Sequence, residues 1–330
     1  MPRAWEGVDS RMCANLATTY MGLNLPSPLV VSASPLARSV DTVRELEAAG
    51  AGAIVLFSLF EEQFAPHPGE PGPDPARYGY SEFLTEPKGY LEHVRKLKET
   101  VEIPIIGSLN ATGCGAWLDF AAEIEEAGAD AIELNIYRVT ADPTLSGAQV
   151  EDIYVEILRR VRRAVKIPVA LKLSPYFSNL TSVAARFDEA GADALVLFNR
   201  FYQPTIDVER RRIVMALELS SPAEARLSAM WIAMLKGQVR AALAATSGIH
   251  GTTEAVRAIM AGADVVMLCS VLLKYGTGRL ADIHRGLCNW LDAHEHGSCD
   301  EVRGAMRLSA QKNPEDYTRR GYAKMLNRHW

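Results

Sequence analysis

The nine residues EAGADALVL (189–197) decide the fold, because close copies of them recur along the chain. The copies are AAGAGAIVL (48–56), EAGADAIEL (126–134) and MAGADVVML (260–268). Each one ends an amphipathic helical pattern, supplies a glycine suited to a helix C-terminus and leads at once into an apolar stretch of strand length. Their separations of more than sixty residues are too long for a solenoid repeat. They therefore mark four helix–strand junctions inside one larger architecture.

Four further apolar strands lie between these junctions: SPLVVSAS from Ser27, IPIIGSLN from Ile103, IPVALKLS from Ile167 and AALAATSG from Ala241. The first three carry a proline near their start, where no hydrogen bond of the sheet is lost. The two kinds of strand alternate, and each is followed by a helical pattern. This order predicts an α/β fold, a closed parallel (β/α)₈ TIM barrel. A doubly wound open sheet is the rival, but no G-x-G-x-x-G follows the first strand.

The chain is predicted to be a single domain over residues 1–330, with the barrel core at about 25–285 and a helical C-terminal extension at 286–330. Two long insertions interrupt it. Residues 59–87, after the second strand, are rich in proline, glycine and acids, which indicates a lid or a partner contact. Residues 199–240, after the sixth strand, are predicted to hold a short strand, MALELS (215–220), and a helix around SAMWIAMLKGQV (228–239).

Composition excludes several classes of function. The 330 residues are 48% hydrophobic and carry a net charge of −5, so no positive field favours nucleic acid or an anionic membrane. No stretch has the ~20 apolar residues that span a bilayer, and the N-terminus lacks the apolar core of a signal peptide. The five cysteines form no C-x-x-C pair, which predicts reduced thiols in a cytoplasmic protein. The histidines show no convincing ligand spacing, so no metal site is expected.

Polar residues gather where the predicted strands end, which in this fold is the end of the barrel that carries chemistry. Side chains alternate along a strand, so in VALKL the bulky Val169 and Leu171 share the outer face and Lys172 points into the lumen. The same alternation in AIELN turns Glu133 and Asn135 inward. We expect Lys172 to serve a ligand, and Glu133 either to serve that ligand or to pair with Lys172.

A second signal lies in ATSGIHGTTEAVRAIMAGADVVMLCSVLLKYG (245–276). Here one strand ends in Ser-Gly, Thr-Thr-Glu opens a helix, and the next strand ends in Cys-Ser. The loops after the last two strands of such barrels commonly hold a phosphate on backbone N–H groups. Taken alone, the stretch fits a phosphate site or an ordinary strand–helix turn equally well.

Six segments together resemble, in order and spacing, class 1 dihydroorotate dehydrogenases and the related domain of dihydropyrimidine dehydrogenase: SPLVVSASPL, PIIGSLN, GADAIELN, PVALKLSPYF, ALVLFN and the 245–276 block. The resemblance implies FMN at the mouth of the barrel, and it also suggests a homodimer. It implies cofactor contacts for Ala33, Ser34, Lys172, Thr246, Ser247, Gly248, Cys269 and Ser270, the last five around the phosphate. It implies substrate contacts for Asn110, Asn135 and Asn199. A cation such as Lys172 beside the flavin would offset the negative charge that builds on reduction.

The substrate half departs from the family pattern. The family continues ELN-x-S-C-P-N, where the cysteine removes a substrate proton, but this chain reads ELNIYRVT. Arg138 stands at the cysteine position and Thr140 at the last asparagine. Arginine keeps its proton and cannot act as a base, although it can bind a carboxylate. Tyr137 and Thr140 are the remaining candidates in this loop to relay a proton. A second family lysine is replaced by Phe57 or its neighbour Ser58.

Three functional hypotheses follow. The first is an FMN-dependent oxidoreductase that oxidises dihydroorotate or a related small carboxylated ring and passes electrons to an acceptor outside this chain. The second is a flavin-free, phosphate-binding lyase or aldolase in which Lys172 forms a Schiff base. The third is a flavin-binding protein without catalysis that works through its insertions as an interaction module.

Overall fold

The computed structural model describes residues 14–64, 87–113, 117–201 and 203–329. Eight parallel strands form a ring that the pairing of β4 with β6 closes. In chain order they are β3 (Leu29–Val31), β4 (Ala53–Val55), β6 (Ile105–Ala111), β7 (Ala131–Ile136), β8 (Val169–Leu173), β9 (Ala194–Leu197), β12 (Ala242–Ala245) and β13 (Val265–Leu268). The predicted TIM barrel is therefore confirmed.

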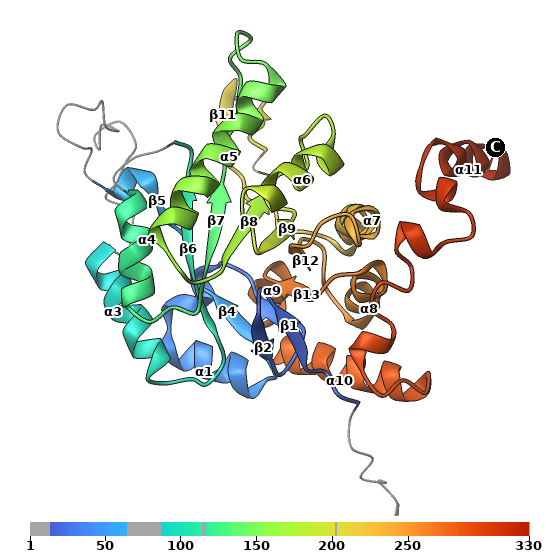
Figure 1. The fold of residues 1–330 in the computed structure, drawn as a ribbon, viewed down its shortest axis with the longest axis horizontal. Coiled ribbons are helices and arrows are strands. Elements are labelled where there is room, and N and C mark those ends of the chain that lie inside the picture. Colours follow the sequence, from blue (N-terminus) through green and yellow to red (C-terminus); the bar gives the residue numbers. More distant parts are fainter. Residues whose placement is uncertain (1–13, 65–86, 114–116, 202, 330) are drawn as a thin grey trace, which may run out of the picture.

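Helices surround the ring of strands (Figure 1). They are α1 (Val40–Ala48), α3 (Pro87–Lys98), α4 (Trp117–Glu126), α5 (Gly147–Ala164), α6 (Leu180–Glu189), α7 (Ala225–Leu235), α8 (Thr252–Ala261), α9 (Ser270–Tyr275) and α10 (Gly278–Ala293). Outward side chains such as Leu171 join the core between strands and helices. Inward side chains such as Ala170 form a second cluster in the lumen. This alternation is the one predicted from VALKL.

A short hairpin, β1 (Thr18–Tyr20) and β2 (Leu23–Leu25), covers the amino-terminal end of the barrel. Tyr20 and Met21 are buried and belong to the lumen cluster. The sequence analysis did not identify this hairpin, because two strands of three residues are too short to show a periodic pattern.

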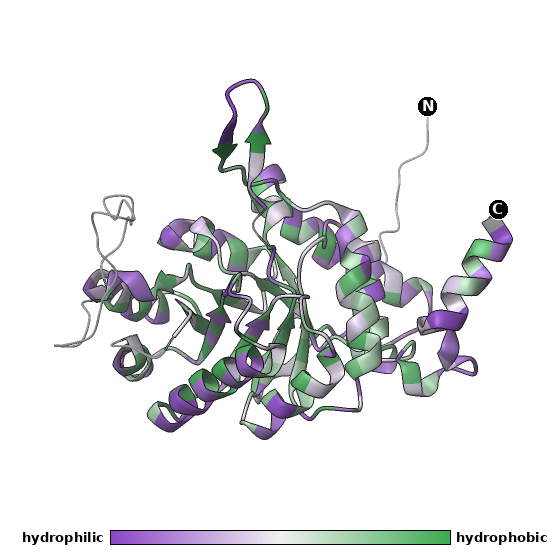
Figure 2. Cartoon of the chain, turned by 90° about the horizontal axis from the view of Figure 1, so that it is seen from above, coloured by the Kyte–Doolittle hydropathy of each residue, from purple (hydrophilic) through white to green (hydrophobic). Residues whose placement is uncertain are grey.

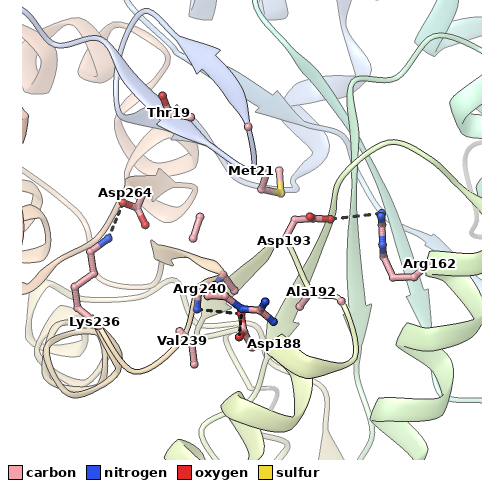
Figure 3. A pocket seen from close by; sticks show the side chains of 15 residues that line it. Thr19, Met21, Arg162, Asp188, Ala192, Asp193, Lys236, Val239, Arg240 and Asp264 are labelled. Carbon is pink, nitrogen blue, oxygen red and sulfur yellow. Dashed lines mark hydrogen bonds and ion pairs between the residues drawn. The ribbon is translucent and has the colours of Figure 1, made fainter.

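The Gly-Ala-Asp ends of the repeats bind the neighbouring strands together. Asp193 accepts the N–H of Val169 at 2.8 Å, and Asp264 accepts the N–H of Leu243 at 2.8 Å. Each aspartate also pairs with a cation (Figure 3), Asp193 with Arg162 and Asp264 with Lys236. Asp130 likewise accepts the N–H of Ile105 and forms an ion pair with Lys98. The repeat is thus a structural clamp at the end of the barrel opposite the strand carboxyl termini.

The first repeat has Gly52 where the others have aspartate, and the structure shows the reason. A Cβ atom at Gly52 would lie 1.9 Å from the carbonyl oxygen of Ser27, so no side chain fits there. The N–H of Leu29 is instead accepted by the Ser27 hydroxyl at 3.2 Å. A serine on the neighbouring segment therefore takes part of the role of the missing carboxylate.

The two insertions differ from the predictions in part. Residues 59–64 form β5 (Leu59–Phe60) and a 3₁₀ turn, η2 (Glu61–Gln63), while 65–86 lie outside the described residues. The predicted strand MALELS is wrong. The strands of that insertion are β10 (Thr205–Asp207) and β11 (Arg212–Val214), and their pairing stops at Val214, one residue before MALELS. Pro204, which has no N–H to donate, stands directly before β10. The predicted helix exists but begins earlier, as α7.

The C-terminal extension contains three 3₁₀ turns, η5 (Cys299–Glu301), η6 (Leu308–Ala310) and η7 (Pro314–Tyr317), followed by α11 (Arg319–His329). The cysteine prediction holds only in part, because Cys269 and Cys299 are free thiols while Cys288 is disulfide-bonded. Thiol count and spacing do not reveal which cysteines the fold brings together. In the described part of the chain, no helix combines the length and the apolar character that crossing a membrane requires.

The close contact at Gly52 gives a stability prediction. Gly52→Ala forces the backbone of Ser27 or of residue 52 to move, and such overpacking costs about 1–3 kcal/mol or more. We expect a clearly lower melting temperature by circular dichroism. Gly278→Ala is the matched control, because a Cβ there meets nothing within 4 Å, and it should leave the melting temperature equal or slightly higher. Equal melting temperatures for both variants would contradict the contact.

Candidate active site at the carboxyl end of the barrel

A buried ion pair occupies the lumen beneath the mouth of the barrel. The Nζ atom of Lys172 lies 3.0 Å from Oε1 of Glu133, and their side chains are 7% and 1% exposed. The same Nζ atom donates to the hydroxyl of Ser32 at 3.2 Å. The pair joins neighbouring strands, since β7 and β8 are adjacent in the ring. Both predicted lumen charges are therefore present, and they contact each other.

The second oxygen of Glu133 is buried with no hydrogen-bond partner among the described residues, and so is the hydroxyl of Tyr20. Burial raises the pKa of Tyr20 well above its ordinary value, and the charge of Glu133 raises it further. Tyr20 therefore remains a neutral phenol and adds no charge to the lumen. Lys172 is the cation that pairs with the Glu133 carboxylate, and no second cation pairs with this carboxylate among the described side chains.

A cavity of about 250 Å³ opens above Lys172. Its walls include all eight residues that the sequence analysis assigned to a cofactor: Ala33, Ser34, Lys172, Thr246, Ser247, Gly248, Cys269 and Ser270. They come from four different strand ends, so the fold, not the sequence order, brings them together. The hydroxyl of Ser34 is buried in this wall and has no hydrogen-bond partner in the described chain.

One corner of the cavity has the backbone geometry of an anion site. Ser247 and Gly248 both have positive φ angles, 68° and 81°. The short helix α9 begins at Ser270, and the first N–H groups of a helix have no acceptor within the helix. Burial raises the pKa of the Cys269 thiol, and the charge of Lys172 only partly offsets this, so Cys269 is an uncharged thiol here.

Ser220 also lies in this corner, and the sequence analysis missed it. Its hydroxyl accepts the N–H of Gly248 at 3.2 Å, and its own N–H donates to the hydroxyl of Ser270 at 3.1 Å. The same hydroxyl lies 3.2 Å from Nε2 of His250. Ser220 belongs to the long insertion, where the sequence analysis placed it at the end of the predicted strand MALELS and gave it no role in the site.

The predicted substrate residues lie beside the cavity. The amide of Asn199 donates to the side-chain oxygen of Asn135 at 2.8 Å, and Asn199 lines the cavity. Asn110 is the register partner of Asn135 on β6, but it does not line the cavity. Asn110 and Asn135 are therefore neighbours on adjacent strands, while Asn199 follows β9, with β8 between it and β7, and lines the cavity.

An aromatic cluster follows the same strands. The rings of Tyr137 and Phe201 are stacked with centroids 5.3 Å apart, and Tyr176 meets Phe201 edge-on at 4.7 Å. Tyr137 follows β7, Tyr176 follows β8 and Phe201 follows β9. Phe201 and Tyr176 were not predicted as site residues, although their positions just past strand ends could have suggested them.

The side chain of Arg138 bonds to the neighbouring strand end. Its Nη1 atom donates to the carbonyl oxygen of Thr112 at 2.9 Å, after β6. Burial raises the pKa of Tyr154 on α5. A hydrogen bond to the Arg138 backbone and the positive charge of Arg138 both lower this pKa and so partly offset the rise. Thr140 is exposed in the loop before α5. None of the three predicted loop residues, Tyr137, Arg138 and Thr140, is among the residues that line the cavity.

A larger cavity of about 760 Å³ lies at the opposite end of the barrel (Figure 3). Its charged side chains are mutually paired: Arg162 with Asp193, Lys236 with Asp264 and Arg240 with Asp188. These are the strand clamps described above and their neighbours. Because the charges satisfy each other, this cavity does not call for a charged ligand.

A closed parallel barrel with a buried lysine and a polar cavity at its carboxyl end is the arrangement of a (β/α)₈-barrel enzyme. Comparison with known proteins specifies the family. The sequence pattern of dihydroorotate dehydrogenase matches residues 15–291. The chain therefore belongs to the dihydroorotate dehydrogenase family, a family of oxidoreductases.

Its relatives match over nearly their whole length. The protein named dihydroorotate dehydrogenase B (NAD(+)), catalytic subunit, from Thermoplasma volcanium is 30% identical over 305 residues, which cover 88% of this chain and 98% of the relative. The protein of the same name from Thermoplasma acidophilum is 27% identical with the same coverage. The one from Methanothermobacter thermautotrophicus is 25% identical over 301 residues, 88% of this chain and 97% of the relative.

The buried pair predicts strong coupling between its members. Lys172→Met leaves the Glu133 carboxylate buried without its cation, and Glu133→Gln leaves the ammonium without its anion; each costs about 3–5 kcal/mol. The double variant removes both charges and should cost much less than the sum. Urea unfolding of the four proteins measures the coupling. The exposed pair Arg285–Asp282 is the control, with a coupling of about 1 kcal/mol or less. Additive effects at Lys172 and Glu133 would contradict a coupled pair.

Proposed function

We propose that the protein is an FMN-dependent oxidoreductase that acts on dihydroorotate or on a related small carboxylated dihydro ring. The observation that carries the proposal is the convergence of eight separated residues on one cavity above Lys172. When bound, FMN would supply the hydride acceptor that no side chain of this chain provides. The protein's own residues bind and orient the reactants.

The cavity chemistry fits FMN. The unpartnered hydroxyl of Ser34 offers a hydrogen bond to a polar ligand edge, and Lys172 offers a buried cation. We assign the phosphate to the corner of Ser247, Gly248 and Ser270, where a positive-φ turn faces the start of α9. Ser220 already bonds to Gly248 and Ser270, so it would share this corner with the phosphate.

We assign Lys172 a charge-stabilising role rather than a nucleophilic one. Its Nζ atom is held by Glu133 and Ser32, and an ion-paired ammonium has no lone pair to attack a carbonyl. A cation fixed in a low-dielectric lumen stabilises negative charge that develops on a bound ring. This geometry favours the oxidoreductase over the aldolase alternative.

We assign the substrate to the side of Asn135 and Asn199, next to the aromatic cluster of Tyr137, Tyr176 and Phe201. Amide groups recognise the donors and acceptors of a polar ring, and flat aromatic faces stack on it. Among the described residues that line the cavity, none is a histidine or a carboxylate. The family's proton-removing cysteine therefore has no evident substitute there, and Tyr137, which follows β7 and stacks on Phe201, is the candidate that the base-bearing loop offers.

We infer that electrons leave through a separate acceptor. The named relatives are catalytic subunits of an NAD-dependent enzyme, and this chain carries no C-x-x-C pair and no dinucleotide fingerprint. A second protein or a small molecule must therefore reoxidise the site. We place the reaction in the cytoplasm. The catalytically inactive flavoprotein remains the second candidate, because the base position is substituted.

The cofactor assignment predicts a yellow protein. Purified protein should show flavin absorbance, and Ser270→Asp should weaken FMN binding by about 100-fold, because a carboxylate repels the phosphate. Ser270→Ala is the control and should keep most of the flavin. A substitution at Gly248 is a poor test, since its Cβ would lie 2.3 Å from the backbone nitrogen of Ala225. Full flavin content in folded Ser270→Asp would contradict the assignment.

The missing base predicts slow turnover of dihydroorotate. A positioned base contributes typically 10²–10⁴-fold, so flavin bleaching on anaerobic mixing with dihydroorotate should be slower than in cysteine-bearing family members by about that factor. Arg138→Cys should not restore the rate, because residue 138 does not line the cavity. Stopped-flow absorbance measures the bleaching rate of the unmodified protein and of the Arg138→Cys variant. Fast bleaching by the unmodified protein that Tyr137→Phe abolishes would instead identify Tyr137 as the base.

A further inference from the structure

A separate cavity lies outside the ring of strands, where α7 packs against α8 and the C-terminal extension joins them. Its volume is about 480 Å³, within the range of roughly 300–1,000 Å³ that is typical of small-molecule sites. Its walls also include Trp290 of α10 and two residues of the extension, Met306 and Tyr317. It shares no lining residue with the cavity above Lys172.

Hydrogen bonds fix the extension against the end of α8. The N–H of Met306 donates to the carbonyl oxygen of Met260 at 2.7 Å, and the N–H of Gly304 donates to that of Ile259 at 3.0 Å. The hydroxyl of Tyr317 in turn donates to the Met306 carbonyl oxygen at 2.6 Å. Met306 and Tyr317 both lie beyond residues 15–291, so part of this cavity is built outside the region that matches the family.

Most of the cavity wall is apolar and adaptable. Met230, Met260 and Met306 line it, and their unbranched side chains adjust to the shape of an apolar ligand. Trp290 adds a flat apolar surface, and the ring of His294 stacks on it with centroids 4.1 Å apart. The wall is therefore suited to enclose an apolar body.

The charged side chains of the wall are all positive. Arg226 of α7 and Arg257 of α8 line the cavity, and no aspartate or glutamate among the described residues does so. Neither arginine makes a side-chain hydrogen bond or an ion pair within the described part of the chain. The two acids of η7 are paired with cations of α11 instead. The cavity thus combines an apolar wall with two available positive charges, in a chain whose net charge is −5.

The last helix of the chain does not fill this cavity. Figure 2 shows the helix that ends at the C-terminus extending away from the barrel, and no described residue of α11 lines the cavity. The helix carries exposed apolar side chains, Tyr322, Met325 and Leu326, but its charged side chains are all basic. Arg226 and Arg257 repel such a helix. The occupant that fits has an apolar body and a negative charge.

We propose that this cavity binds a small apolar carboxylate of the medium-chain fatty acid class. The apolar chain lies against the methionines and Trp290, and the carboxylate lies at Arg226 and Arg257. Arginine binds a carboxylate through two parallel N–H bonds. Both arginines are exposed, so the head group stays in contact with water while the chain is buried. The site is distinct from the proposed flavin site and goes beyond the proposed oxidoreductase function.

Calorimetric titration of the purified chain with decanoate tests the proposal, after passage over a hydrophobic resin that removes co-purified lipid. Decanoate should bind with a dissociation constant below about 100 μM. Decan-1-ol, which has the same chain without the charge, should bind at least about tenfold more weakly, because it forms no charge-assisted bond to arginine. Absence of decanoate binding, or equal affinity for the alcohol, would overturn the proposal, whether or not the protein holds FMN.

Variants locate the binding site. Arg226→Gln with Arg257→Gln should weaken decanoate binding by about tenfold or more and leave decan-1-ol binding unchanged. Arg319→Gln with Arg328→Gln is the matched control, because it removes the same charge from exposed positions of α11 outside the cavity, and it should bind as the wild type does. Wild-type affinity in the first variant would place decanoate elsewhere and contradict the site.

A pair of substitutions at Met306 separates charge from packing. Met306 is 42% exposed, so the fold tolerates a charged side chain there. Met306→Glu and Met306→Lys remove the same apolar contact but add opposite charges to the wall. Decanoate should bind the glutamate variant at least about tenfold more weakly than the lysine variant. Equal affinities would show that no anion lies at this wall.

Discussion

The structure depends on one constraint, which is that two opposite charges in the lumen of the barrel must be buried together. Lys172 and Glu133 are almost completely buried and lie 3.0 Å apart. Either charge alone would cost several kcal/mol in desolvation, and their contact offsets this only with good geometry. Adjacent β7 and β8, with their side chains alternating in register, supply that geometry. Small lumen residues below them, such as Ala131 and Ala170, leave the necessary space.

The rigidity required for this pair comes from the other end of the barrel. Asp130, Asp193 and Asp264 each bind a strand N–H and a cation, so the amino ends of the strands are held in place by short polar contacts. Each such contact to a charged group contributes about 1.5–3 kcal/mol. With one end clamped, the loops at the carboxyl end can change without loss of the fold. The departures from the family pattern are concentrated there.

The sequence predicted those parts of the molecule that repeat. The strand order, the inward direction of Lys172 and Glu133 and the eight cavity residues follow from periodicity and from the family resemblance. Features without a repeat were missed or misplaced. Ser220 acts through a long-range contact with Gly248 and Ser270. The insertion strands are Thr205–Asp207 and Arg212–Val214 rather than MALELS, and Cys288 is disulfide-bonded. Each depends on which distant segments meet, and local propensity carries no information on that.

Arg138 and the buried ion pair belong to parts of the same strand–loop unit that differ in their surroundings. The strand β7 holds Glu133 and Asn135 in register with β8, so any change there would disturb Lys172. After Ile136 the chain has left the sheet, and Arg138 donates to the Thr112 carbonyl and lies close enough to Tyr154 to affect its pKa. Arg138 thus joins the loop after β7 to the end of β6, and no hydrogen bond or ion pair among the described residues links it to Lys172 or Glu133. The residue at position 138 can therefore differ between family members without disturbing the cavity above Lys172, because it lies in the loop beyond the end of β7 and does not line that cavity.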